Sequence, residues 1–374
     1  MRKVKWNPLF SGACMLLGGM LLWVGAARGD ISSTNPAALL IFPKIVVDTS
    51  AGVDTLIQIT NTADVPINVR CYLVNATPQS PPATTGSLLP PTAITTTTCI
   101  ETDFTFLLTA KQPIMWKASA GLQFLPLSAL MGPGGQRNAG SIPPAPQDPM
   151  VAELKCVEVG LAGDEYPIDS NDLIGQATIE NINTPDIQTY NAYGVQSIAG
   201  QNNRDNTLVL GQEYNGCANY LILDHFFDNA PDTVGSGPVR TSLTLVPCSE
   251  DFVLQSWPRI VVQFLVYNEF EQRFSTSRTT GCFSELVLSD IDTRAGNTGA
   301  NDNYSIFNFL VQGTLTGQTW IRGVQGTSSG NGLLAIAEEY HSDGAHFGAY
   351  VPIQKGTRSK NDTIKLVGAS PAAP

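Results

Sequence analysis

Apolar and polar residues alternate with a period of two along much of this 374-residue chain. In residues 66–74 the odd positions are apolar, Cys71 among them, whereas the even positions include Asn68 and Arg70. Such alternation is typical of a half-buried β-strand. Residues 260–267 are apolar on both faces, which predicts a central strand. Further strands are expected at residues 151–159, 173–179, 218–227, 239–246, 284–291, 306–312 and 333–340.

Turn-forming residues separate these segments roughly every 10–20 residues, and no helical stripe is longer than about ten residues. The strands are therefore expected to pack face to face, since half-buried strands must cover one another's apolar sides. We predict a mostly β fold, with one or two immunoglobulin-like or jelly-roll-type antiparallel β-sandwiches after an N-terminal signal peptide.

The first 29 residues have the three parts of a secretory signal peptide. Arg2, Lys3 and Lys5 precede an apolar run at residues 14–27, and small residues then lead into a polar stretch from Asp30. The run has about 14 residues, whereas a membrane span needs roughly 20. Cleavage is expected after residue 29, with residues 26 and 27 as alternatives, and only its length argues against an uncleaved anchor. We therefore expect a secreted protein in the periplasm, at the cell surface or in the extracellular medium.

Loss of the signal peptide makes the chain more acidic. It removes four of the 21 Lys and Arg residues and none of the 32 Asp and Glu residues, so the net charge changes from −11 to −15. A polyanion without a basic cluster repels nucleic acid. We expect an unknown protein or glycan surface partner, no nucleic acid, no cofactor and no membrane span after cleavage.

Six of the seven cysteines remain in the mature chain, because Cys14 lies in the signal peptide. Cys14 begins the apolar run and does not end it, so lipid attachment is not expected. An even number of cysteines in an oxidising compartment predicts disulfides. The candidates are Cys71, Cys99, Cys156, Cys217, Cys248 and Cys282. Short loops favour Cys71–Cys99 and Cys248–Cys282, which leaves Cys156–Cys217; zinc is disfavoured because no CxxC spacing occurs.

Length and composition suggest two folded domains. Residues 1–29 are the expected signal peptide, residues 30–122 an N-terminal β-sandwich, and residues 151–355 a larger C-terminal β-sandwich. Residues 123–150 are rich in Pro and Gly and are expected to be a linker, or a loop crossing a single domain. Residues 356–374 are expected to be a polar tail.

One segment resembles a known class of domain. An apolar strand at residue 37 is followed by the pattern TLIQITNT, the strand INVRCY and the later strand FTFLLTAKQ. Residues 37–119 thereby resemble immunoglobulin-like β-sandwich modules of exported bacterial proteins. The resemblance implies a fold and no particular function.

No motif predicts catalysis or a cofactor site. His225 lies at a strand end between Asp224 and aromatic residues, where a structural histidine is favoured over a general base. Asp164, Asp169 and Asp172 lie in an acidic loop and are candidate calcium ligands, although solvated turns are the favoured explanation for them.

The mature tryptophans, Trp116, Trp257 and Trp320, are expected in the core, with sugar stacking as the alternative. Together these features predict an exported, non-enzymatic structural, adhesive or interaction protein of the cell envelope or extracellular space. The alternative is a secreted carbohydrate-binding protein or a hydrolase acting on polysaccharide.

Overall fold

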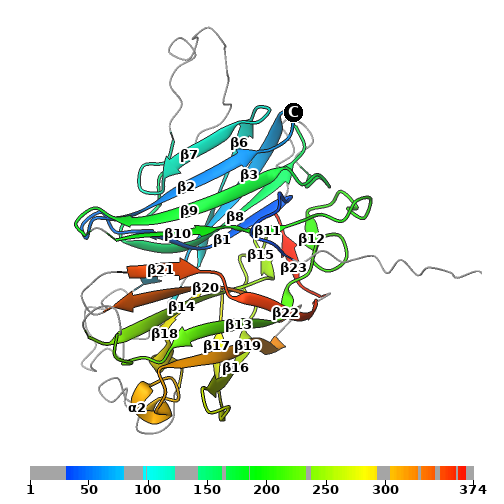
Figure 1. The fold of residues 1–374 in the computed structure, drawn as a ribbon. Coiled ribbons are helices and arrows are strands. Elements are labelled where there is room, and N and C mark those ends of the chain that lie inside the picture. Colours follow the sequence, from blue (N-terminus) through cyan, green and yellow to red (C-terminus); the bar gives the residue numbers. More distant parts are fainter. Residues whose placement is uncertain are drawn as a thin grey trace, which may run out of the picture.

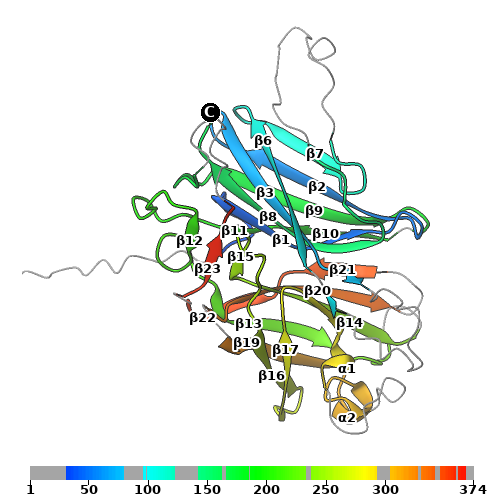
Figure 2. The same cartoon turned by 180° about the vertical axis from the view of Figure 1, so that it is seen from behind.

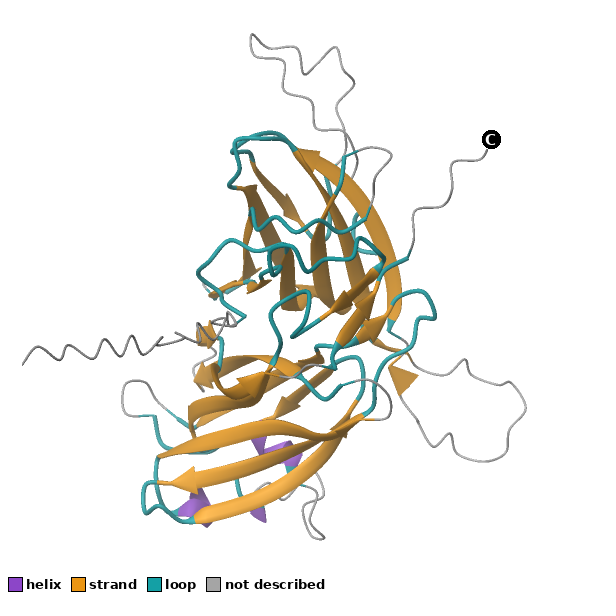
Figure 3. Cartoon of the chain, turned by 90° about the vertical axis from the view of Figure 1, so that its right-hand side faces the viewer, coloured by secondary structure: helices purple, strands orange, loops and turns teal. Residues whose placement is uncertain are grey.

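The computed structural model describes residues 31–79, 96–97, 99–122, 142–161, 166–184, 186–232, 237–292, 304–326, 330–341, 346–358 and 361–367. The predicted signal peptide and residues 123–141 of the predicted linker lie outside this set. Of the described residues, 59% are in strands and 3% in helices, which confirms the mostly β prediction and is plain in Figure 3.

The N-terminal part contributes two sheets. The N-terminal five-stranded sheet contains, in spatial order, β11 (Tyr193–Val195), β1 (Leu39–Val47), β8 (Met150–Val159), β3 (Ile67–Asn75) and β6 (Ile100–Leu108). The N-terminal four-stranded sheet contains β10 (Ile187–Asn191), β9 (Leu173–Asn181), β2 (Val53–Asn61) and β7 (Pro113–Lys117). A two-stranded ribbon pairs β4 (Pro78–Gln79) with β5 (Thr96–Thr97).

The C-terminal part contributes two further sheets and shares a small one with the rest of the chain. The C-terminal five-stranded sheet contains β17 (Arg273–Thr280), β16 (Ile260–Asn268), β19 (Thr316–Gly326), β13 (Ala218–Phe226) and β22 (Ile353–Arg358). The C-terminal four-stranded sheet contains β18 (Ser284–Val287), β14 (Val239–Pro247), β20 (Leu333–His341) and β21 (His346–Tyr350). The three-stranded sheet contains β12 (Thr207–Val209), β23 (Thr363–Lys365) and β15 (Glu250–Asp251).

The prediction of one or two sandwiches is wrong. Apart from the two-stranded ribbon, the strands are divided among five small sheets, arranged as a five-blade β-propeller. Each sheet combines strands from distant parts of the chain, and only β15 and β23 among the named pairs run parallel. Period-two alternation fails to reveal this division because it is the same in every antiparallel sheet.

Most of the expected strands are present, and β16 is central between β17 and β19 as predicted. Two expected strands are partly wrong, since α1 (Leu288–Ile291) and α2 (Phe309–Gln312) are short helices. The side chain of Asn308 caps α2 by accepting a hydrogen bond from the backbone nitrogen of Leu310 at 2.9 Å. Residues 363–365, within the predicted polar tail, form β23, whose Ile364 is buried. The predicted domain boundaries stay a prediction.

Three apolar clusters hold the sheets together. The first is built mainly from both N-terminal sheets, and the third from the two larger C-terminal sheets. The second joins the other side of the N-terminal five-stranded sheet to the three-stranded sheet. Figures 1 and 2 show β10 and β21 side by side where the N-terminal and C-terminal parts meet.

All six predicted cysteines form disulfides, but the predicted pairing is wrong. The bonds are Cys71–Cys156, Cys99–Cys282 and Cys217–Cys248, with sequence separations of 85, 183 and 31 residues. Cys71 on β3 lies directly opposite Cys156 on β8, with the two Cα atoms 4.0 Å apart. Strand pairing between distant segments therefore decided the Cys71–Cys156 bond, which a preference for short loops does not predict.

Candidate functional site

The outer side of the C-terminal five-stranded sheet carries an ordered set of aromatic and polar side chains. Along β13, β16 and β19 alternate residues such as Leu221, Phe264 and Ile321 are buried in the core. The residues between them point the other way. We call this set the aromatic face; it comprises Tyr220, Ile222, Asp224, Gln263, Leu265, Tyr267, Gln318, Trp320 and Arg322.

Trp320 occupies the middle of the aromatic face. Strand register places it opposite Ile222 on β13 and Leu265 on β16. Its ring lies 5.5 Å from that of Tyr220 and 6.5 Å from that of Tyr267, in both cases edge to face. Such aromatic pairs stabilise each other's orientation. Three rings therefore cross three adjacent strands.

Hydrogen bonds hold the polar members of the face. Trp320 Nε1 donates to Gln318 Oε1 at 2.7 Å, and Gln318 Nε2 donates to Asp224 Oδ1 at 2.9 Å. Arg322 donates from Nε to Gln263 Oε1 at 2.8 Å and from Nη1 to the Tyr220 hydroxyl at 2.7 Å. These contacts orient the side chains before any ligand arrives.

A cation covers the central ring. Lys355 on the edge strand β22 places its Nζ atom 4.4 Å from the centroid of the Trp320 ring. Lys355 is exposed to solvent, and such exposed cation–π contacts contribute about 0.5–1 kcal/mol. A ligand could displace the ammonium group at little cost.

The aromatic face leads into a hollow at each end. One hollow, of about 630 Å³, is bordered by Tyr267, Gln318 and Asp224, and also by Glu269 and Glu339. We call it the acidic hollow. The other, of about 330 Å³, is bordered by Tyr220 and Arg322 together with Asn219 and Asn331. The face and its two hollows form one continuous, mixed polar and aromatic surface.

The carboxylates of the acidic hollow do not have the features of a glycosidase pair. Glu269 Oε1 accepts hydrogen bonds from the hydroxyl and the backbone nitrogen of Thr316, at 2.7 and 2.9 Å, and these bonds lower the pKa of Glu269. A general acid needs a raised pKa instead. Glu339 is paired with His341, whose Nε2 lies 3.0 Å from Glu339 Oε1. This arrangement suits binding better than bond cleavage.

His225 has the structural role that the sequence predicts. Its ring is buried, and Nδ1 donates to the backbone oxygen of Phe226 at 2.8 Å. Nε2 then accepts from the Thr319 hydroxyl at 2.8 Å. Burial lowers the pKa of His225 to about 4. Both nitrogens are thus engaged, and the ring is no general base for the hollow it borders.

The tryptophan prediction is correct for Trp116 and wrong for Trp320. Trp116 is 5% exposed and packs in the first apolar cluster, and Trp257 packs edge-on against Phe252 at 6.1 Å. Trp320 points outward. The missed signal was the alternation along the strand. Trp320 lies on the same strand face as Gln318 and Arg322, two positions away on either side, whereas Ile321 lies on the opposite face.

The calcium candidates are not brought together in the described residues. Asp169 Oδ2 accepts from the backbone nitrogen of Gly200 at 3.1 Å, and the backbone nitrogen of Asp172 donates to Glu158 at 3.3 Å. Asp164 lies outside the described residues. Within the described ranges no group of three or more His, Cys, Asp or Glu could hold a metal ion. A calcium site in this loop stays a prediction.

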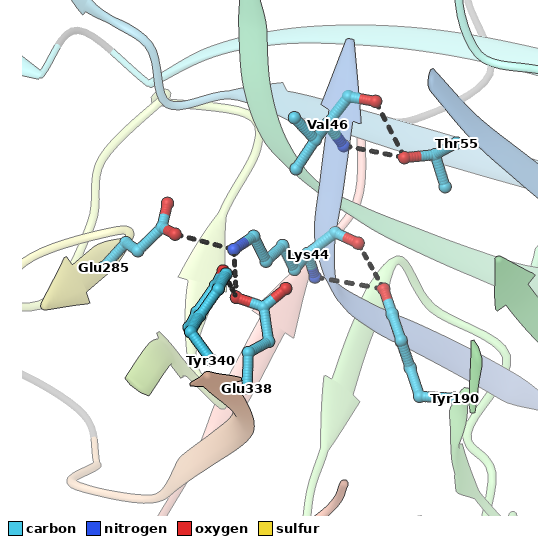
Figure 4. Close-up of polar contacts among 7 residues, drawn as sticks. All are labelled: Lys44, Val46, Thr55, Tyr190, Glu285, Glu338 and Tyr340. Carbon is cyan, nitrogen blue, oxygen red and sulfur yellow. Dashed lines mark hydrogen bonds and ion pairs between the residues drawn. The ribbon is translucent and has the colours of Figure 1, made fainter. Parts of the chain in front are cut away.

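A second polar cluster, shown in Figure 4, lies buried between the N-terminal and C-terminal parts. Lys44 on β1 forms ion pairs with Glu338 on β20 and, at 2.6 Å, with Glu285 on β18. Burial acts to lower the pKa of Lys44, but the two glutamates outweigh it and raise the pKa. A permanently protonated lysine is no nucleophile. What its ion pairs do is link the N-terminal five-stranded sheet to the C-terminal four-stranded sheet.

The backbone around Lys44 explains why its side chain points away from the N-terminal sheets and toward the C-terminal part. A β-bulge interrupts the pairing of β1 with β8 between Phe42 and Ile45. The Tyr190 hydroxyl satisfies the backbone of Lys44 there, since it donates to the carbonyl and accepts from the nitrogen at 3.2 Å (Figure 4). Bulges commonly redirect a side chain in this way.

Another charged cluster, around Lys155, is buried completely. Lys155 on β8 contacts Glu153 on the same strand at 2.6 Å and Glu250 on β15 at 2.5 Å, and all three side chains are at most 1% exposed. The strand segment LKCVE gave no sign of this burial. The charged cluster attaches the three-stranded sheet to β8, in addition to the apolar contacts between them.

Comparison of the chain with protein families, curated proteins and solved structures finds no match. Among the described residues no helix has the length and apolar character needed to cross a membrane. The three disulfides are compatible with an exported protein.

Proposed function

We propose that this chain is an exported, non-enzymatic interaction protein that binds a glycan through the aromatic face. The observation that carries the proposal is the outward row of Tyr220, Trp320 and Tyr267, framed by hydrogen-bonding side chains and open at both ends to a hollow. The disulfides and the predicted signal peptide support an oxidising location, in the periplasm, at the cell surface or in the medium.

The chemistry of a sugar matches this surface. A pyranose ring presents a patch of C–H groups that packs on an aromatic ring, and its rim of hydroxyls needs partners once water is removed. On the aromatic face Trp320 offers the ring, and Gln263, Gln318 and Arg322 offer donors and acceptors beside it. The surface continues past Trp320 toward a hollow at each end, and this extent suits a chain of sugars.

Binding without cleavage is favoured over hydrolysis. Glu269 has a lowered pKa, and its Oε1 atom accepts two hydrogen bonds from Thr316. His225 is buried and neutral at physiological pH. We therefore expect an adhesive or carbohydrate-binding role.

The test is retention of the mature protein on insoluble polysaccharides, namely cellulose, chitin and yeast cell-wall glucan, measured by pull-down. Trp320→Ala should lower retention at least tenfold on whichever polymer is bound. Tyr304→Ala is the matched control, because it removes an aromatic ring that is 66% exposed and borders neither of the two hollows. Release of reducing sugar should stay at background.

Equal retention of Trp320→Ala and wild type, with unchanged circular dichroism, would refute the proposal. Retention on none of the three polymers, followed by no binding to a soluble glycan array, would also refute it. Reducing sugar released by wild type but not by Trp320→Ala would favour the polysaccharide hydrolase.

A further inference from the structure

A groove of about 410 Å³ lies in the N-terminal part, on sheets that do not include the aromatic face. One wall is the segment at residues 33–35, and the other is formed by ends of β2, β9 and β10. Its volume lies within the range of about 300–1,000 Å³ that is usual for small-molecule sites. We call it the amide groove, for the carboxamides of Asn35, Gln58, Gln176 and Asn191 that line it.

The wall at residues 33–35 is held on both sides. Ser32 and Gly194 exchange two backbone hydrogen bonds of 3.0 and 2.6 Å, and Ala37 donates to Leu173 at 2.9 Å. Gln196 Nε2 also donates to the backbone oxygen of Pro36 at 3.0 Å. Hydrogen bonds therefore hold the segment at residues 33–35 in place on both sides, so this wall of the groove is a fixed part of the fold.

Two glycines allow the close approach that shapes the groove. A Cβ atom on Gly194 would come within 3.0 Å of the Ala37 Cβ and of the Ser32 carbonyl oxygen. A Cβ atom on Gly175 would meet the Phe42 ring at 2.6 Å. Real Cβ atoms avoid both distances, so larger residues at these positions would push the walls apart.

None of the described residues that line the groove has an ionisable side chain. Its carboxamides each combine a donor and an acceptor, and threonine and serine hydroxyls lie among them. Gln176 Nε2 reaches Asn191 Oδ1 at 3.3 Å, a long bond. Among the described residues, the carboxamides of Asn35 and Gln58 have no hydrogen-bond partner. These groups are available to a ligand.

We propose that the amide groove binds the terminal residue of a neutral, polyhydroxylated ligand, that is, of an uncharged glycan. A hydroxyl both donates and accepts, as a carboxamide does, whereas a charged ligand would lose hydration without gaining a counter-ion. The exposed side chain of Ile174, at 41%, gives the C–H face of a sugar an apolar contact. This second site is independent of the aromatic face.

The experiment is calorimetric titration of the mature protein with maltohexaose, cellohexaose, chitohexaose and, as an anionic comparison, hexagalacturonate. It is carried out in the Trp320→Ala background, so that the aromatic face does not contribute. At least one neutral hexasaccharide should bind, and the double change Gln176→Ala with Asn191→Ala should weaken that binding at least tenfold. Thr178→Ala, on the same strand but outside the groove, should leave it unchanged.

The inference is overturned if no neutral hexasaccharide binds at millimolar concentration, if the double variant binds as well as its parent, or if hexagalacturonate binds better. Should the double variant not fold, side-chain amide NMR signals of the parent decide: those of Gln58, Gln176 and Asn191 shift on titration, or the inference fails. Because Trp320 is absent from this test, loss of the proposed function leaves its result unaffected.

Discussion

The completely buried Lys155 cluster makes a quantitative prediction for Lys155→Met. Methionine keeps most of the volume of lysine but removes the positive charge that lies 2.6 Å from Glu153 and 2.5 Å from Glu250. Removing one member of a buried ionic cluster costs about 3–5 kcal/mol, because the remaining charges lose their counter-ion. We expect a loss of this size in the free energy of unfolding at pH 7.

The loss should depend on pH. Burial raises the pKa of Glu153 well above 4.5 and also raises that of Glu250, while Lys155 opposes both shifts. A carboxyl with a raised pKa in the folded state retains a proton that the unfolded chain releases. Its contribution to stability is full below the unfolded pKa and is lost as pH rises through the folded pKa.

Without Lys155 both carboxyls must stay protonated in the folded protein. One additional retained proton makes the free energy of unfolding fall by about 1.4 kcal/mol for each pH unit above the unfolded pKa. The difference between wild type and Lys155→Met should therefore grow from pH 5 to pH 7. Adding Glu153→Gln and Glu250→Gln should remove this pH dependence.

The assay is urea unfolding followed by tryptophan fluorescence at pH 5, 6 and 7. Lys117→Met is the matched control, since Lys117 pairs with Glu180 at 2.5 Å but is 47% exposed. Exposed pairs contribute about 0–1 kcal/mol. A cost for Lys155→Met that equals the control, or one that is constant over this pH range, would refute the reasoning.

Three further predictions concern other parts of the molecule. Lys44→Met should lower the unfolding free energy by about 3 kcal/mol, as expected for a buried ion-pair partner; a cost as small as that of Lys117→Met in the same urea assay would contradict this. Burial raises the pKa of Glu158 to about 7, so the free energy of unfolding of the wild type should fall by about 3 kcal/mol between pH 4.5 and pH 7 because of this residue. Glu158→Gln should abolish that fall; an unchanged pH slope would argue against it. Thiol titration of the unfolded, unreduced mature protein should find no free cysteine, or one if Cys14 is retained; six would exclude the disulfides.

The strands could be predicted from local pattern because alternation depends only on neighbouring residues. Residues 260–267 were expected as a central strand, and β16 lies between two others. The expected strand at residues 306–312 failed where Asn308 caps a helix. A short apolar run is compatible with a strand or with a helix, and a single capping hydrogen bond at its start is enough to favour the helix.

The candidate site was partly within reach of the sequence. Trp320 alternates with Ile321 and so lies on the same strand face as the polar residues Gln318 and Arg322, although its size suggests the core. The acidic hollow was out of reach, because Asp224, Glu269 and Glu339 come from three strands or turns that meet only in space. The amide groove likewise depends on Gly194 and Gly175 meeting partners far away in the chain.

By itself, then, the sequence determined the mostly β content, the disulfide-forming cysteines and the acidic net charge, since composition and period-two alternation are local properties. Only the tertiary structure decided the division into five sheets, the Cys71–Cys156 pairing and the burial of Lys44 and Lys155. The physical reason is that a half-buried strand accepts any partner that covers its apolar side. The choice among partners is made by long-range packing, which no local window contains.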